Sequence, residues 1–380
     1  MMLPAAIKQK RILLGQLAAR GDCLYATAVA RQIKADDPGC HLTWAIGSAF
    51  RAILDGNPHV DAVWEIAMDE HSDRGRAWYL FHAEAQRRLH AGEYDVAFFT
   101  QIHPANFKNF DGTVRASIFR GYPHPITVPV APVLRLRDDE IENVRQFAVR
   151  HRLIRQSPVI LFEFASSSGQ SFVNPEFAAI ATQGILAQIP ECTIVLTSQI
   201  AINSPDPRIV SGHTLSFREN AELTKYCTLL IGCSSGLTWL CTADWAKRLP
   251  TIQLLKGSTG VYASVVHDHE RFGLPTDAVI EMTECQPEHL VQCVVSVINE
   301  GVDRAKRLYH QRLTLRRGFH QQVLDSLVKI GAAGDALASC AVTLRRYGLY
   351  PAAVALTAHV LLSIAATAVR NLVARLRKGR

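Results

Sequence analysis

The stretch that decides the fold is RILLGQLAARGDCLYATAVARQIKADDPGCHLTWAI, residues 11–46. It begins with an apolar run, Arg11–Leu17, that has the length and composition of a buried parallel strand. Residues 22–35 follow with apolar side chains at close to helical period, and Pro38-Gly39 ends that helix. The next apolar run, His41–Ile46, predicts a second strand. A strand, a helix and a strand in this order indicate a parallel βαβ unit.

The same alternation recurs along most of the chain. Further strands are predicted at residues 61–66, 94–100, 159–164, 193–197, 228–232, 251–255 and 278–281. The sequence therefore predicts an α/β protein with two Rossmann-like, doubly wound domains. We expect an N-terminal domain at 1–155, a second at 156–300 and a helical extension at 301–380. Open parallel sheets bind ligands at the carboxyl ends of their strands, so we expect the site in a cleft there.

Composition and charge narrow the class of protein. The 380 residues are 48% hydrophobic and 20% charged, which is typical of a folded globular chain. No apolar signal segment begins the sequence, and the nine cysteines show no C-x2-C pair, so we expect a cytoplasmic protein. Residues 301–380 hold fourteen Lys and Arg against three Asp and Glu, whereas the remainder is mildly acidic. A basic tail on an acidic body favours an anionic surface and disfavours nucleic acid as the partner.

Gly21-Asp22 follows the first predicted strand after a loop of three residues. Its carboxylate is therefore expected at the carboxyl edge of the sheet, at the start of the next helix. Asp is a preferred helix cap, and a carboxylate at such an edge also suits a general base. From the residue types alone, both interpretations stay open.

This segment resembles glycosyltransferase family 9, the ADP-heptose:lipopolysaccharide heptosyltransferases. The resemblance rests on Gly21-Asp22, on the following DDPG (36–39), on GNPHVDAV (56–63) and on Tyr94-Asp95. It covers residues 10–100 well and 155–260 more loosely. It implies the GT-B fold and an inverting, metal-independent transfer of a hexose or heptose from a nucleotide sugar to a lipopolysaccharide-like glycan or glycolipid of the cell envelope. It also implies that Asp22 is the catalytic base, and no cofactor is expected.

Two loops are candidates for holding the donor. Both follow apolar strands and offer Gly, hydroxyls and backbone N–H groups, which suit a diphosphate, although Ser and Gly are also ordinary turn residues. The predicted donor-binding residues are Ser167, Ser168, Gly169 and Gln170 in the first loop, and Ser234, Ser235, Gly236, Leu237 and Thr238 in the second. The second loop resembles the GNDSGPxHLA segment of the family, with Ser234 in place of its Asp and Trp239 in place of its His. Gln170 and Ser171 occupy the region where the family has a Lys or Arg. The donor is therefore a nucleotide sugar whose identity these departures leave open.

Other polar residues were considered as acceptor-binding or metal-binding groups. Gly21, His103, Lys108, Arg115 and Arg120 are candidates for binding an anionic acceptor, and a solvated loop is the alternative. His267-Asp268-His269-Glu270-Arg271 is dense in titratable groups, but it lacks a third metal ligand, so we expect a solvated loop and no metal site. No Walker A motif and no GxGxxG after the first strand occur, which disfavours a P-loop enzyme and a dehydrogenase.

Two other functions remain open from the sequence. The departures at Gln170, Ser234 and Trp239 also fit a catalytically lapsed GT-B scaffold that binds glycans or assembles envelope enzymes. A nucleotide-sugar epimerase is a weaker third possibility, because no donor-side acid can be placed from the sequence.

The C-terminal tail suggests contact with a membrane. Residues 349–369 carry no formal charge, and Arg370, Arg375, Arg377, Lys378 and Arg380 follow. A span would place these charges outside a cytoplasmic body, against the positive-inside rule. We therefore expect a peripheral helix on the inner face of the cytoplasmic membrane, with Leu361, Ile364, Leu372 and Leu376 in the interface. A helix packed on the protein body or on a second subunit is the alternative.

Overall fold

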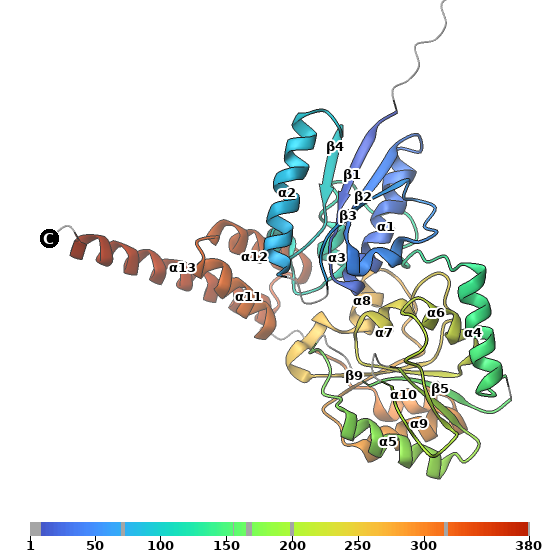
Figure 1. Cartoon of the computed structure of the whole chain (residues 1–380). Helices are drawn as coiled ribbons and strands as arrows, with labels where there is room; N and C mark the ends of the chain where they lie inside the picture. The colour runs from blue at the N-terminus through green and yellow to red at the C-terminus, as the bar shows by residue number, and fades with distance from the viewer. Residues whose placement is uncertain are drawn as a thin grey trace, which may run out of the picture. The chain divides into compact units, whose positions relative to one another are not determined.

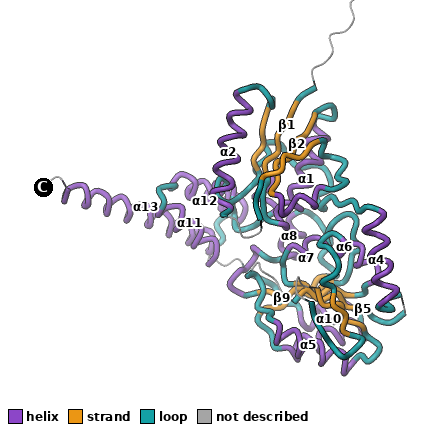
Figure 2. Tube along the Cα trace, viewed as in Figure 1, coloured by secondary structure: helices purple, strands orange, loops and turns teal. Residues whose placement is uncertain are grey.

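The structure is a computed structural model. It describes residues 9–69, 73–154, 156–164, 169–197, 201–314 and 318–378. The chain divides into two compact units, of which the first comprises residues 1–131 and 319–380 and the second residues 132–318. Figure 2 shows the strands in orange as two separate sheets.

The first unit is built on a parallel sheet of four strands, in the order β3-β2-β1-β4. The strands are β1 (Arg11–Gly15), β2 (His41–Gly47), β3 (Ala62–Ile66) and β4 (Val96–Phe99). Helices α1 (Arg20–Asp36), α2 (Arg74–His90) and α3 (Arg115–Phe119) and the 3-10 turns η1 (Ser48–Leu54) and η2 (Phe107–Asn109) belong to the same unit. The interior of the sheet is closed to solvent, since Leu13, Leu14 and Trp44 are fully buried. The predicted βαβ unit is confirmed, with Arg11 of β1 opposite His41 of β2 in register.

The second unit has a parallel sheet of six strands, in the order β10-β9-β8-β5-β6-β7. The strands are β5 (Val159–Glu163), β6 (Thr193–Thr197), β7 (Ile209–Ser211), β8 (Leu229–Gly232), β9 (Thr251–Leu255) and β10 (Val279–Thr283). Its helical elements are α4 (Asp138–Arg150), α5 (Pro175–Gln188), α6 (Glu219–Leu223), η3 (Thr224–Tyr226), α7 (Gly236–Leu240), η4 (Gly257–Tyr262), α8 (Val265–Arg271), α9 (Pro287–Glu300) and α10 (Val302–Tyr309). The strands and helices share one apolar core, which includes Phe162, Ile185 and Val294. The α/β class with two doubly wound units is thus confirmed.

Two boundaries differ from those expected. The division between the units lies at Ala131/Pro132, ahead of α4. Helix α4 belongs to the second unit because Arg218 donates to Glu140 over 2.8 Å. The Asn143 amide donates to Glu219 over 2.7 Å in the same interface. These paired polar contacts hold α4 against α6.

The three C-terminal helices belong to the first unit rather than to a separate extension. They are α11 (Gly318–Lys329), α12 (Ala333–Tyr347) and α13 (Pro351–Lys378), drawn in red-brown in Figure 1. Ser339 of α12 donates to the Phe110 carbonyl over 2.5 Å, and the rings of Phe110 and His320 lie 4.9 Å apart. Burial lowers the pKa of His320 to about 4, so this histidine is neutral, and its Nε2 donates to the Ser339 hydroxyl oxygen over 3.0 Å because the Ser339 hydrogen is given to Phe110.

The loop expected at residues 267–271 is a helix, so that expectation was wrong. Helix α8 begins after Ser264, whose hydroxyl accepts from the His267 N–H over 2.9 Å and so caps the first turn. Asp268 and His269 are buried, and His269 Nδ1 lies 2.9 Å from the Pro275 carbonyl. Among the residues that the structure describes, no group of three His, Cys, Asp or Glu side chains is arranged to hold a metal ion.

Candidate active site

Asp22 lies where the sequence placed it, just beyond the carboxyl end of β1. It is the third residue of α1, whose N-cap is Ala19. The Ala19 N–H hydrogen-bonds the Asp22 carboxylate, as an acidic residue in this position commonly does. Asp22 is thus part of the helix start, but only half-buried, and so retains access to solvent.

Electrostatics set Asp22 apart from a simple capping residue. Burial raises its pKa from 3.8 to about 7, although the charge of Arg74 and the Ala19 N–H both act to lower it. A carboxylate with a pKa near 7 is a competent proton acceptor at neutral pH. Partial desolvation of the His103 ring lowers its pKa as well, and the charge of Arg74 adds to that effect. Arg74, at the start of α2, therefore acts electrostatically on both Asp22 and His103.

A buried amide network fixes the loop that carries Asp22. The Gln101 side-chain oxygen accepts from the N–H groups of Leu17 and Ala18, each over 2.9 Å. Gln16 donates to that same oxygen over 3.0 Å, and Thr100 donates to Gln16 over 2.9 Å. Because buried polar groups are costly unless paired, this satisfied network favours one loop conformation. No local sequence pattern indicates this network, since its two halves are up to 85 positions apart.

The predicted acceptor residues fall into two groups. His103 and Lys108 are exposed, and Gly21 is half-buried beside Asp22. Arg115 is buried, with its guanidinium 4.5 Å from the centre of the Tyr25 ring. Arg120 forms an ion pair of 3.0 Å with the buried Asp111. The last two side chains thus stabilise the first unit, and only Gly21, His103 and Lys108 remain open to a ligand.

The second predicted donor loop closes on a buried carboxylate. Glu163, the last residue of β5, accepts from the Cys233 N–H and from the Thr238 hydroxyl, each over 2.7 Å. The Ser235 hydroxyl donates to the other oxygen of the same carboxylate. Burial raises the pKa of Glu163, and these donors partly oppose that rise. From the sequence Glu163 is only a strand residue, because its partners lie about 70 positions further along the chain.

These contacts engage most polar groups of the loop, because the N–H groups of Cys233, Ser234 and Leu237 have partners as well as the hydroxyls. Ser234 and Thr238 are buried, and the Ser234 hydroxyl donates to the Ala263 carbonyl over 2.6 Å. Gly236 is half-buried and Leu237 is buried. A Cβ on Gly232 would lie 2.5 Å from the Thr238 hydroxyl oxygen, so glycine permits this tight turn.

The first donor loop is described only in part. Ser167 and Ser168 lie outside the described residues. Gly169 is exposed, with a positive φ of 68° that favours glycine. The Gln170 carbonyl accepts from the Lys256 N–H over 2.9 Å, which ties this loop to the end of β9. Because Cys233 interacts with Ser171, the two predicted donor loops lie together in the second unit.

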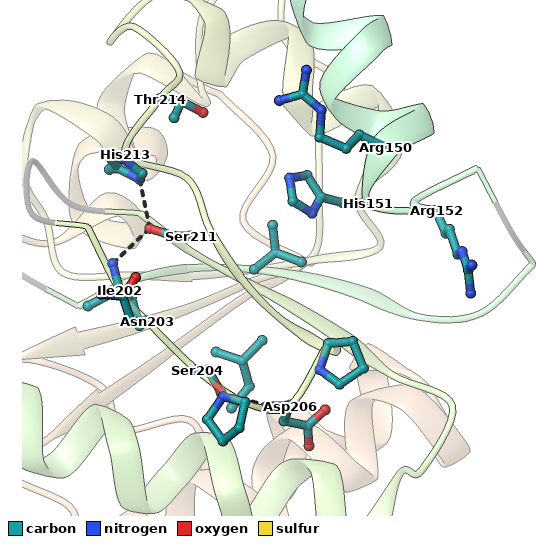
Figure 3. Close-up of a pocket in the computed structure, with 14 residues that line it drawn as sticks. Arg150, His151, Arg152, Ile202, Asn203, Ser204, Asp206, Ser211, His213 and Thr214 are labelled. Atoms are coloured by element: carbon teal, nitrogen blue, oxygen red, sulfur yellow. Dashed lines mark hydrogen bonds between the residues drawn. The ribbon is translucent and has the colours of Figure 1, made fainter.

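A separate hollow of about 930 Å³ lies in the second unit, between the end of α4 and the segment around β7. Figure 3 shows Arg150, His151 and Arg152 on one side and Ser211 and His213 on the other. Ser211 lies 3.0 Å from His213 Nδ1, as the dashed line shows. None of the predicted donor residues that the structure describes, Gly169, Gln170 and 234–238, lines this hollow.

Known structures share the architecture described above. No model of a known protein family and no curated protein matches the chain. A family 9 glycosyl transferase from Veillonella parvula superposes with a TM-score of 0.52 at 13% identity, over 86% of this chain and 97% of that one. The ADP-heptose lipopolysaccharide heptosyltransferase II of Escherichia coli gives 0.49 at 13% identity, over 77% and 100%. A putative UDP-N-acetylglucosamine 2-epimerase from Listeria monocytogenes gives 0.45 at 9% identity, over 85% and 97%.

At these identities the likeness concerns the fold alone. It agrees with the two parallel sheets and their covering helices, and with the resemblance that residues 10–100 carry. The chain therefore has the GT-B fold, with two Rossmann-like units and C-terminal helices, in the form seen in a glycosyltransferase of family 9.

Proposed function

We propose that this protein is an inverting, metal-independent glycosyltransferase. It transfers a hexose or heptose from a nucleotide-sugar donor to a glycan or glycolipid of the cell envelope, of the lipopolysaccharide type. The observation that supports this most is the half-buried Asp22, with a pKa of about 7, at the carboxyl end of β1. The shared GT-B fold adds support at the level of architecture.

The chemistry follows from one proton acceptor and one leaving group. The acceptor hydroxyl oxygen attacks the anomeric carbon, and Asp22 takes the hydroxyl proton as the new C–O bond forms. The bond between the anomeric carbon and the diphosphate breaks, and the nucleoside diphosphate leaves with the electron pair. A single displacement inverts the anomeric centre. Gly21, His103 and Lys108 are proposed to contact the acceptor.

The donor diphosphate is proposed to lie against Gly169, Gln170 and the loop at 232–238. To oppose its charge in place of a metal ion, N–H and hydroxyl groups of that loop would exchange their present bonds to Glu163 and Ala263 for bonds to the diphosphate. The buried Glu163 supplies a carboxylate close to Ser234, where the family pattern has an Asp. Burial raises the pKa of this carboxyl, and the hydrogen bonds that it accepts oppose that rise.

A catalytically lapsed scaffold is the second candidate. It is favoured by the inward hydroxyls of Ser234, Ser235 and Thr238, which bond Ala263 and Glu163. The two candidates differ in donor binding, because a glycan-binding scaffold needs no nucleotide sugar. Titration of the full-length protein with a panel of nucleotide sugars separates them.

We expect activity to be independent of divalent cations. No Asp-x-Asp motif occurs in the sequence, and the His267 and His269 pair lies on a helix, where residues two apart face different ways. The measurement is nucleoside diphosphate release before and after treatment with EDTA, with added Mg²⁺ or Mn²⁺ as the control. Rates that agree within about twofold are expected. Loss with EDTA and recovery with metal would refute metal independence.

We further propose that the reaction takes place on the cytoplasmic face of the membrane. Pro351–Ala374 of α13 is one helix, among the described residues, whose length and composition would allow it to cross a membrane. The basic residues that follow it in the sequence add attraction to anionic lipid.

A further inference from the structure

The first half of α13 is part of the protein body. Ala353, Leu356 and Val360 are buried, and the last two share an apolar cluster with residues of α11 and α12 such as Leu324. On the same stretch, His359 Nε2 lies 2.8 Å from Asp325 of α11. The beginning of α13 is therefore held by both packing and a polar contact.

The second half of α13 exposes an apolar face. Figure 1 shows the helix continuing beyond α11 and α12 towards the C-terminus. Its exposed large apolar side chains are Leu361, Leu362, Val369, Leu372, Val373 and Leu376, with exposed fractions of 41–71%. At about 100° per residue they fall within an arc of about 120°, roughly opposite the buried residues. Such a contiguous exposed face marks an interaction surface.

The positive charges on and after the second half of α13 indicate which partner this apolar face binds. Arg370 lies on the exposed half, and Arg375, Arg377, Lys378 and Arg380 follow in the sequence. No Asp or Glu occurs after Asp335. A second copy of the chain would bring the same positive charges together, which opposes self-association. An anionic lipid surface supplies both the apolar phase and the opposite charge.

The packed first half argues against a transmembrane span. Beyond Ile364, α13 has fourteen residues, Ala365 to Lys378. At about 1.5 Å per residue they extend about 21 Å, which is less than the bilayer core of about 30 Å, and they include Arg370. A longer span would have to detach His359 from Asp325 or carry that carboxylate into hydrocarbon.

We propose that α13 is an interfacial anchor, which lies in the plane of an anionic membrane with the Leu361–Leu376 face in the lipid. This deepens the proposed membrane location and rests on it. The anchor is continuous with the first unit, because Ser339 of α12 bonds the Phe110 carbonyl. Asp22 belongs to that same compact unit, so the anchor carries the proposed base to the membrane on which a lipid-linked acceptor is held.

The test is flotation of full-length protein with vesicles of phosphatidylcholine alone or with about 30% phosphatidylglycerol. The variant Leu372→Glu with Leu376→Glu changes the apolar face at residues 58% and 65% exposed, which leaves the core untouched. The matched control, Thr367→Glu with Asn371→Glu, adds the same charge on another side of the helix. Transfer to a water-soluble acceptor is measured in parallel, because α13 contains no proposed site residue.

We expect wild type to bind the anionic vesicles and to be released by high salt. The apolar-face variant should bind at least tenfold more weakly than the matched control, with transfer to the soluble acceptor unchanged in both. Equal weakening in the two variants, or no vesicle binding by wild type, overturns the anchor. Release from cell membranes only by detergent, and not by carbonate, overturns the in-plane arrangement. Absence of transfer with intact vesicle binding would count against the proposed enzyme and leave the anchor standing.

Discussion

The variant Asp22→Asn should lose about 10²–10⁴ in kcat, the usual worth of a general base. An amide cannot take the proton of the acceptor hydroxyl, whereas the donor loops belong to the other unit and are unchanged, so donor affinity should stay within about threefold. The measurement is steady-state nucleoside diphosphate release. Asp36→Asn, the same substitution at the other end of α1, is the control and should keep kcat within about twofold. Wild-type turnover in Asp22→Asn would leave Asp22 with only its role at the helix start.

The same residue sets the expected pH dependence. Since the base must be ionised and its pKa is about 7, kcat/KM should rise with pH and level off above about 8. Arg74 lowers that pKa, so Arg74→Gln should move the inflection to higher pH.

The stability of the folded protein should depend on the pH in the opposite sense to its activity. Between pH 4 and 7 the unfolded chain loses the Asp22 proton while the native state keeps it, so Asp22 costs increasing stability as pH rises. Asp22→Asn should therefore melt higher than wild type at pH 8, with the difference vanishing near pH 4.

The second large effect is expected at Glu163. Glu163→Ala leaves the Cys233 N–H and the Ser235 and Thr238 hydroxyls without their acceptor. At about 1–3 kcal/mol for each buried donor left unpaired, we expect a loss of about 3 kcal/mol or more in the free energy of unfolding. Donor affinity should fall by at least tenfold, because the 232–238 loop loses the group that orders it. Urea unfolding and donor titration measure the two effects.

Glu163→Gln is the matched control for that change. Its amide keeps an oxygen that can accept from Cys233 and Thr238, and it preserves the volume of the side chain. Because these acceptor contacts and the volume are kept, Glu163→Gln should stay close to wild type in stability and donor affinity. If Glu163→Gln lowers stability and donor affinity as much as Glu163→Ala does, the loop needs an ionised carboxylate. If Ala keeps wild-type stability and affinity, Glu163 does not order the loop.

The local features of the fold could be predicted from the sequence, and the long-range features could not. Runs such as His41–Ile46 and Val159–Phe164 predicted strands because buried parallel strands are continuously apolar. Gly21-Asp22 was placed at the carboxyl edge of the sheet because it follows a strand after a loop of three residues. By contrast, Gln101 and Glu163 act through partners roughly 70 to 85 positions away, and nothing in their neighbourhood indicates those partners.

Three further differences have identifiable physical causes. A capping signal was present at α8, where Ser264 stands three residues before His267, but the density of charged residues favoured a loop. Strand β7 has only three residues and lies at the edge of the sheet, which is too short for a periodic pattern. The boundary between the units lies before α4 and not at residue 155, because Glu140 of α4 pairs with Arg218. These two residues are 78 positions apart, so the sequence gives no local sign of the contact.

The most direct test of the proposed enzyme is titration of the full-length protein with a panel of nucleotide sugars, followed by an assay of nucleoside diphosphate release with envelope glycolipid as acceptor. The proposal predicts that at least one nucleotide sugar binds and that its diphosphate is released by wild type and not by Asp22→Asn. If no nucleotide sugar binds while the glycan still does, the proposed transferase is contradicted and the lapsed scaffold is favoured.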